Sequence, residues 1–155
     1  MNRNACYFVC VLGSMLLINT PVLFAEKTPS NLFLISNIHD NSFYGIASSN
    51  KDDKVYLERI KIRYLIEAVQ KSSLTFIRNN KTYKGAEAAA HLSWKYSFAG
   101  KRVQTTHDFI ERVASQSIQT GSSYLARTPE GKTYPLRDIL YNELERLEQF
   151  LALKK

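Results

Sequence analysis

The segment Lys54–Lys71 constrains the fold most, because its apolar residues follow the helical period on an unusually wide face. Two stripes of apolar side chains share that face, the first formed by Val55, Ile62, Leu65, Ile66 and Val69 and the second by Leu57, Ile60 and Tyr64. A helix with so wide an apolar face needs other elements packed over most of its surface. We therefore expect a helix here that is largely buried.

A hairpin and a second helix are predicted next. Thr75–Arg78 and Lys81–Tyr83 flank an Asn-Asn dipeptide at 79–80, which tolerates positive φ and suits a tight turn between two strands. Residues 85–99 then predict a helix that is rich in Ala at its start and aromatic at its end. Gly100 follows at the position where a left-handed cap closes a helix.

Elements of the same kinds are predicted in the last third of the chain. Thr105 is expected to be the N-cap of a helix, with Asp108 as its capping-box partner and core residues Phe109, Ile110, Val113 and Ala114. Residues 124–127 and 132–134 flank a Thr-Pro-Glu-Gly turn. Pro135 then opens a helix that runs to about Leu153. Its apolar face consists of Ile139, Leu140, Leu144, Leu147 and Leu151.

Together these elements predict an α+β fold in which about four helices pack on two short antiparallel β-hairpins. The order helix, hairpin, helix occurs twice, and Lys81-Thr82-Tyr83 recurs as Lys132-Thr133-Tyr134. Three matching residues are weak evidence for an internal repeat. A duplicated helix-hairpin-helix unit and a single unrepeated domain therefore both stay open.

The first 25 residues predict a secretory signal peptide. Arg3 precedes an apolar run from Ala5 to Ile18, Pro21 breaks that run, and Ala25 stands before Glu26, where cleavage is expected. At about 14 residues the run is shorter than the roughly 20 that cross a bilayer. We therefore expect export, with no membrane span after the signal is removed.

Three parts of the chain follow from these patterns. Residues 1–25 are the signal peptide. Residues 26–53 are rich in Asn, Ser and Asp, which predicts a flexible, extended N-terminal arm with at most one short strand at Leu32–Ile38. Residues 54–155 are expected to form a single α+β domain, which is long enough to bury a core of its own.

Both cysteines lie in the predicted signal, so they are absent from the mature chain. Cys6 lies at the start of the apolar run and Cys10 further inside it, whereas a lipid-accepting cysteine follows such a run. The mature chain therefore has no disulfide, no cysteine metal ligand and no cysteine nucleophile. Packing has to supply its stability.

The chain carries a formal charge of +7, and without Arg3 of the signal the mature form is a basic protein of charge +6 (7 − 1). Lys and Arg alternate with Glu and Asp along the sequence instead of forming a block. A solvated basic surface accounts for this pattern. Binding to an anionic envelope polymer, driven by the net charge, is the alternative.

Three separated motifs resemble the YfeK-like family of small exported proteobacterial proteins with an uncharacterised domain. They are Ser72-Ser73-Leu74-Thr75-Phe76-Ile77-Arg78-Asn79, then Ala86-Glu87-Ala88-Ala89-Ala90-His91-Leu92 with Lys95-Tyr96, and a stretch with Phe109-Ile110, Ala114-Ser115, Ser117, Gly121 and Tyr124. The resemblance runs from Ile62 to about Leu147. Asn80 stands where the family has a turn glycine, and Thr120 where it has a serine. The resemblance implies a periplasmic location and no assigned function.

Glu87, His91 and Lys95 are spaced four apart, so on a helix they form one polar column. A His oriented by Glu87 could act as a general base for Ser115 or Ser117, which would make a small hydrolase. No strand-turn-helix serine motif supports this reading. In the structural interpretation, His91 braces the hairpin while Glu87 and Lys95 bond backbone groups or each other.

The serine-rich stretch 115–123 has two interpretations as well. Hydroxyls and free N–H groups after a helix, with Gly121 able to adopt positive φ, can hold an anion or a peptide carboxylate. Alternatively, these residues cap the preceding helix and turn the chain. The candidate ligand-binding residues are Arg78, His91, Ser115, Ser117, Gly121 and Tyr124.

The remaining patterns narrow the function classes. No two histidines have helical metal-site spacing, so we expect no metal and no cofactor. Aromatic and basic residues are plentiful but match no nucleic-acid motif, so we expect no nucleic-acid partner. Most aromatics are expected to be core or half-buried packing residues. The favoured function is a non-enzymatic binding or interaction module of the cell envelope, whose partner is an envelope protein or a small anionic ligand.

Overall fold

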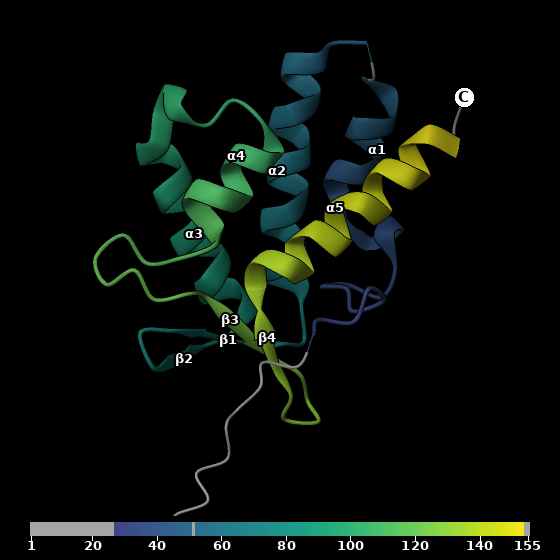
Figure 1. Cartoon of the computed structure of the whole chain (residues 1–155). Helices are drawn as coiled ribbons and strands as arrows, with labels where there is room; N and C mark the ends of the chain where they lie inside the picture. The colour runs from purple at the N-terminus through teal and green to yellow at the C-terminus, as the bar shows by residue number, and fades with distance from the viewer. Residues whose placement is uncertain (1–26, 51, 154–155) are drawn as a thin grey trace, which may run out of the picture.

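The computed structural model describes residues 27–50 and 52–153, and in them five helices and a four-stranded antiparallel sheet form an α+β fold (Figure 1). The predicted fold class is thus confirmed. The signal peptide expected for residues 1–25 lies outside the described residues. In Figure 1 the strands lie at the bottom, and α2, α3 and α4 rise above them.

The central helix is α2 (Lys54–Lys71), capped at its start by the Asp53 carboxylate, which accepts the Tyr56 N–H over 2.9 Å. Its buried side chains are Ile60, Ile62, Tyr64, Leu65, Ala68 and Val69. This helix is therefore largely buried, as its wide apolar face predicts. Val55 departs from the expectation: it is 65% exposed, because it lies in the first turn, at the open end of a groove along the helix.

The sheet is built from β1 (Thr75–Arg78), β2 (Lys81–Tyr83), β3 (Leu125–Arg127) and β4 (Thr133–Pro135), in the spatial order β2-β1-β3-β4. The sequence predicted two hairpins, and the pairing of β1 with β3 joins all four strands into one sheet. Asn79 and Asn80 between β1 and β2 have φ of 49° and 61°. Pro135, expected to open the last helix, instead ends β4 opposite Leu125.

One row of side chains crosses the sheet on the face that the helices cover. Tyr83, Phe76, Ala126 and Tyr134 are aligned by the strand register from β2 to β4. The last three are buried and belong to the core. The sheet therefore contributes a short apolar row to a core that is formed mostly by helices. The proposed duplication of a helix-hairpin-helix unit stays a prediction.

A glycine sets the close approach of α3 (Gly85–Ala99) to α2. A Cβ on Gly85 would lie 2.5 Å from the Val69 carbonyl oxygen and 2.8 Å from that of Gln70. Only a residue without a side chain fits against these backbone atoms. The first turn of α3 is thereby packed directly on the last turn of α2.

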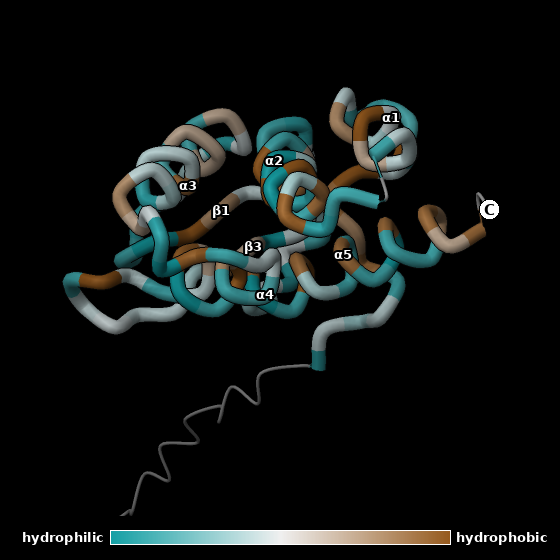
Figure 2. Tube along the Cα trace, turned by 90° about the horizontal axis from the view of Figure 1, so that it is seen from above, coloured by the Kyte–Doolittle hydropathy of each residue, from teal (hydrophilic) through white to brown (hydrophobic). Residues whose placement is uncertain are grey.

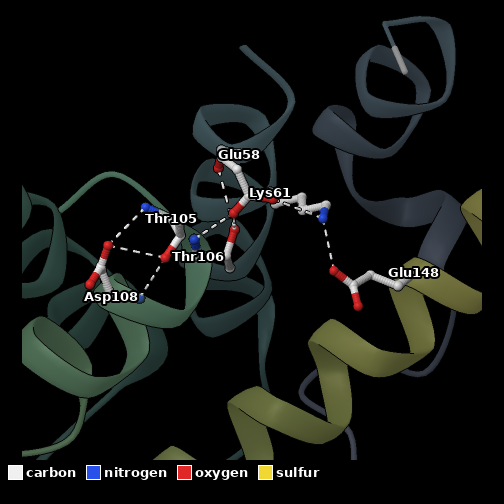
Figure 3. Close-up of polar contacts among 6 residues, drawn as sticks. All are labelled: Glu58, Lys61, Thr105, Thr106, Asp108 and Glu148. Atoms are coloured by element: carbon white, nitrogen blue, oxygen red, sulfur yellow. Dashed lines mark hydrogen bonds and ion pairs between the residues drawn. The ribbon is translucent and has the colours of Figure 1, made fainter. Parts of the chain in front are cut away.

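The short helix α4 (Thr106–Phe109) is capped twice at its start. Thr105 and Asp108 form the predicted capping box, and Glu58 of α2 accepts the Thr106 N–H over 2.6 Å and its hydroxyl over 2.8 Å (Figure 3). Burial opposes ionisation of Glu58, but these bonds and that from Lys61 outweigh it and lower its pKa. Lys61 lies 3.0 Å from Glu58 and 2.8 Å from Glu148, which links α2 to the last helix.

The segment after α4 does not continue as an ordinary α-helix. Residues Ile110–Ala114 form a wider, π-type turn, although its apolar side chains still enter the core as predicted. The last helix, α5 (Leu136–Leu153), buries the five predicted residues from Ile139 to Leu151. Each fully buried leucine of this kind contributes about 1.5–3 kcal/mol.

The described part of the expected N-terminal arm is folded. It contains a 3-10 turn at Ile38–Asp40 and α1 (Ser42–Ser49), with no strand at Leu32–Ile38. Its buried core residues are Leu34, Ile35, Ile38, Tyr44 and Ala47. The helix α1 contacts α2 and α5. Residues 27–50 thus differ from the flexible extended arm that their composition suggests, while the division of the chain into domains stays a prediction.

Candidate functional site

A cavity of about 160 Å³ lies between α3 and the sheet. Three of the predicted ligand-binding residues line it: Arg78 at the end of β1, His91 on α3 and Tyr124 just before β3. The rest of the wall is mainly apolar, formed by Phe76, Ile77, Ala88, Leu92, Leu125 and Leu136. Tyr83 and Glu87 complete it. The structure therefore brings three of the predicted ligand-binding residues to one place.

Arg78 is half-buried at this cavity. Its guanidinium donates to the Tyr83 hydroxyl over 3.2 Å and lies 4.9 Å from the centre of the Tyr83 ring. Within residues 27–50 and 52–153, no carboxylate forms an ion pair with it. This half-buried guanidinium therefore has N–H groups that no acidic side chain of the described residues accepts.

Lys95, on α3, contacts Tyr124 and is buried, with 5% of its surface exposed. Its ammonium donates to the carbonyl oxygens of Val113 and Gln116 and, over 3.3 Å, to the Tyr124 hydroxyl. Burial and the charge of Arg78 lower the pKa of Lys95 to about 8. Lys95 therefore keeps its proton at neutral pH and closes the wide turn Ile110–Ala114.

His91 completes this chain of hydrogen bonds, with its Nε2 3.3 Å from the Tyr124 oxygen. Because an ammonium has no acceptor, Lys95 donates to the Tyr124 oxygen, and His91 Nε2 shares a second hydrogen bond with the same hydroxyl. Burial, together with the charges of Arg78 and Lys95, lowers the pKa of His91, which favours the neutral form of its ring.

The residues of the hydrolase hypothesis are not joined by hydrogen bonds in the described part of the chain. Glu87 accepts the Lys84 N–H over 2.8 Å in a capping box at the start of α3. Ser115 donates to the Ile110 carbonyl over 2.6 Å. His91 bonds Tyr124 instead of a serine. Both Glu87 and Lys95 thus bond backbone groups, which is what the structural interpretation of the polar column expects.

The serine-rich stretch forms a closed turn beside the cavity. Ser117 is buried, its N–H donates to the Ser122 carbonyl over 2.9 Å, and its own carbonyl accepts the Gly121 N–H over 2.8 Å. Gly121 has a φ of 68°. The Thr120 hydroxyl reaches Asn79 across 2.8 Å. Neither Ser117 nor Gly121 lines the cavity, so the backbone groups that were candidates for binding an anion are used within the turn.

Tyr83 was missed as a site residue, although the strand pattern contains a signal for it. Arg78 is paired with Lys81 across the turn, and Tyr83 lies two residues further on the same strand. Side chains two residues apart on a strand share a face, so Arg78 and Tyr83 are diagonal neighbours. Trp94 and Phe98, at 58% and 68% exposed, are exceptions to the expectation that most aromatics are buried or half-buried.

The described residues contain neither a metal-binding cluster nor a membrane-spanning helix. Among the described residues, no group of three or more His, Cys, Asp or Glu side chains could hold a metal ion. Within the same part of the chain, every helix is too short or too polar to cross a bilayer.

Comparisons with known proteins agree with the resemblance noted above. Residues 57–148, more than half of the chain, match the model of a family described as a family of unknown function, DUF5329. Over 68 residues the chain is 38% identical to the uncharacterized protein YfeK of Salmonella typhimurium, a match that covers 43% of this chain and 57% of that protein. The chain thus spans little more than half the length of this relative. No solved structure matches.

Proposed function

Because the chain belongs to the DUF5329 family, which has no assigned function, we propose from the cavity itself that it binds a small anionic ligand with an apolar part. The observation that carries the proposal is Arg78: a half-buried guanidinium at a cavity, without a carboxylate partner among the described residues. Arginine in such a position is suited to a carboxylate or a phosphate, which it can bind through two parallel hydrogen bonds.

The other polar groups favour the same class of ligand. Lys95 adds a second positive charge next to Tyr124, and His91 Nε2 is already engaged with the Tyr124 hydroxyl. Glu87 is the acidic residue of the wall, and its carboxylate is engaged by the Lys84 N–H. The cavity therefore combines the guanidinium donors of Arg78 with a second positive charge nearby, which suits an acceptor group such as an anion.

The size and walls of the cavity limit the ligand further. Its volume of about 160 Å³ is below the 300–1,000 Å³ of pockets for drug-sized molecules. Its wall is mostly apolar. The proposed ligand is therefore a short-chain carboxylate or a small phosphate ester, with its apolar part against Phe76, Leu92 and Leu136.

The proposal places the protein in the periplasm as a non-enzymatic binding module. Export is supported by the signal-peptide pattern of residues 1–25, and N-terminal sequencing of protein from a periplasmic fraction tests it. Cleavage after Ala25 is the expected result. Binding of an anionic envelope polymer is the competing role, and it is supported by the charge of +6 that remains without Arg3 of the predicted signal (7 − 1). The two roles differ in salt dependence, since polymer binding through dispersed charges falls steeply with ionic strength.

The test is native mass spectrometry on the chain from residue 26 onward, purified without denaturation, followed by titration with short-chain carboxylates and phosphate esters. A retained or added mass that is lost in Arg78→Gln and kept in Arg127→Gln supports the cavity. Arg127 is a matched control because it is an exposed arginine on β3 outside the cavity wall. Equal binding by both variants, or uncharged alcohols binding as well as carboxylates, contradicts the proposal.

A further inference from the structure

A second concave surface runs along α2, away from the cavity described above. Figure 2 shows α2 between α3 and α1, and the outward face of α2 is the floor of an open groove of about 1250 Å³. Its walls are residues of α1, of α3 and of the connection 100–105. The lining residues of α2 run from Lys54 to Gln70, which is about 24 Å along a helix. The groove is therefore long enough for a peptide segment.

The charges of the groove are unbalanced. Its four basic residues have no carboxylate partner among the described residues, and they are Lys54, Arg59, Arg63 and Lys101. Its two carboxylates are engaged: Glu58 with Lys61 and Thr106 (Figure 3), and Glu67 with Lys71 and Ser42. The groove thus presents positive charge that nothing within the described chain neutralises.

Apolar side chains lie between these charges. Val55 is 65% exposed, and Phe43, Ile66 and Tyr96 are half-buried along the same groove. The guanidinium of Arg63 lies 5.9 Å from the centre of the Phe43 ring. An apolar floor with basic rims is complementary to a segment that carries apolar residues on one side and acidic residues on its flanks.

We propose that this groove binds an acidic amphipathic segment of a partner protein. A second copy of the chain fits poorly, because each copy is strongly basic, with a charge of +7 for the whole sequence and +6 without Arg3, and like charges repel. A flat membrane surface fits poorly as well, because the charged and apolar residues lie within a concave channel between α1 and α3. The proposal is independent of the anion cavity, which lies on the other side of α3 against the sheet and shares no lining residue with the groove.

The test uses a set of fluorescent amphipathic peptides of about 16 residues, the length of the groove as a helix, with leucines at helical spacing and glutamates on the flanks. Their matched controls carry glutamine in place of glutamate. Binding is measured by fluorescence anisotropy to the chain from residue 26 onward and to two double variants, Arg59→Glu/Arg63→Glu and the control Lys81→Glu/Arg127→Glu. The control reverses two exposed charges of the sheet that lie outside the groove.

The glutamate peptides are expected to bind, and the glutamine peptides to bind at least about tenfold more weakly. The affinity for the glutamate peptides should fall by the same factor in Arg59→Glu/Arg63→Glu and stay unchanged in the control variant. Circular dichroism checks that both double variants are folded. The comparison of glutamate with glutamine peptides uses the unmutated protein, so it does not depend on the folding of the variants. The proposal is overturned by equal binding of both peptide types, by equal loss in both double variants, or by no binding at about 1 mM. Binding to vesicles of phosphatidylglycerol and phosphatidylcholine, without binding to any peptide, also overturns it and assigns the surface to a membrane.

Discussion

The Tyr64 hydroxyl donates to the Glu143 carboxylate over 2.6 Å, and both side chains are completely buried. Glu143 of α5 also accepts the Leu34 N–H over 2.8 Å and the Arg146 guanidinium over 2.5 Å. One carboxylate thus connects the N-terminal segment, α2 and α5 at the centre of the fold. Burial and the nearby Glu143 raise the pKa of Tyr64, so this hydroxyl keeps its hydrogen.

Replacing Glu143 by Leu should lower the free energy of unfolding by about 3–5 kcal/mol, because it leaves Arg146, whose side chain is 12% exposed, without its carboxylate partner. Tyr64→Phe removes one hydrogen bond and should cost about 1 kcal/mol. Urea denaturation followed by circular dichroism measures both. Equal losses in the two variants would show that the carboxylate is not the centre of this network.

Lys95 should make stability depend on pH in the alkaline range. Its pKa is about 8 in the folded chain and 10.5 as the ordinary value, so between these values the unfolded state binds more protons. The free energy of unfolding should therefore rise from pH 8 to 10.5, relative to that of Lys95→Met at the same pH. Urea denaturation at a series of pH values measures the difference, and the exposed Lys84→Met serves as control. A flat difference contradicts the lowered pKa.

His91 should titrate below pH 6.5, because burial, Arg78 and Lys95 all disfavour its charged form. In the window between the lowered pKa and 6.5, the unfolded chain takes up the proton first, so stability falls as the pH falls. His91→Gln should remove this dependence, and Arg78→Gln should move the midpoint upward. NMR titration of the ring protons gives the midpoint directly; a value above 6.5 would refute the assignment.

Replacing Gly85 and Gly45 by alanine should change the stability of the chain in opposite directions. Gly85→Ala places a Cβ 2.5 Å from the Val69 carbonyl oxygen and should cost about 1–3 kcal/mol. Gly45→Ala, in α1, meets nothing within 4 Å and should stabilise the chain by about 0.5–1 kcal/mol through helix propensity. Thermal melts of the two variants compare them, and a stabilised Gly85→Ala would mean that α3 lies further from α2.

The sequence predicts well those elements whose signal is local. The period of α2, the cap at Thr105 and the apolar face of α5 depend on residues within a few turns of one another, and the structure has them where the pattern placed them. The boundary at Pro135 was misplaced because a proline suits both the first turn of a helix and the end of an edge strand.

The folding of residues 27–50 could not be predicted in the same way. Their composition is polar and broken, and their fixed position depends on partners far along the chain, such as the bond between Leu34 and Glu143. The contacts of Lys95 could not be predicted for the same reason. The polar column on α3 was visible in the sequence, whereas its acceptors, Val113 and Gln116, come from a turn whose position only the folded chain defines.

The position of Glu143 has a consequence for the order in which the chain folds. The Leu34 N–H and the Tyr64 hydroxyl find their buried acceptor only after residue 143 has been synthesised and α5 has docked. Until then, ribosome-bound or truncated chains lack this acceptor, and the N-terminal segment is joined to α2 alone, through contacts such as that of the Asn41 side chain with the Tyr64 carbonyl. Completion of the buried network is thus delayed until α5 is available, since contacts across more than one hundred residues form late.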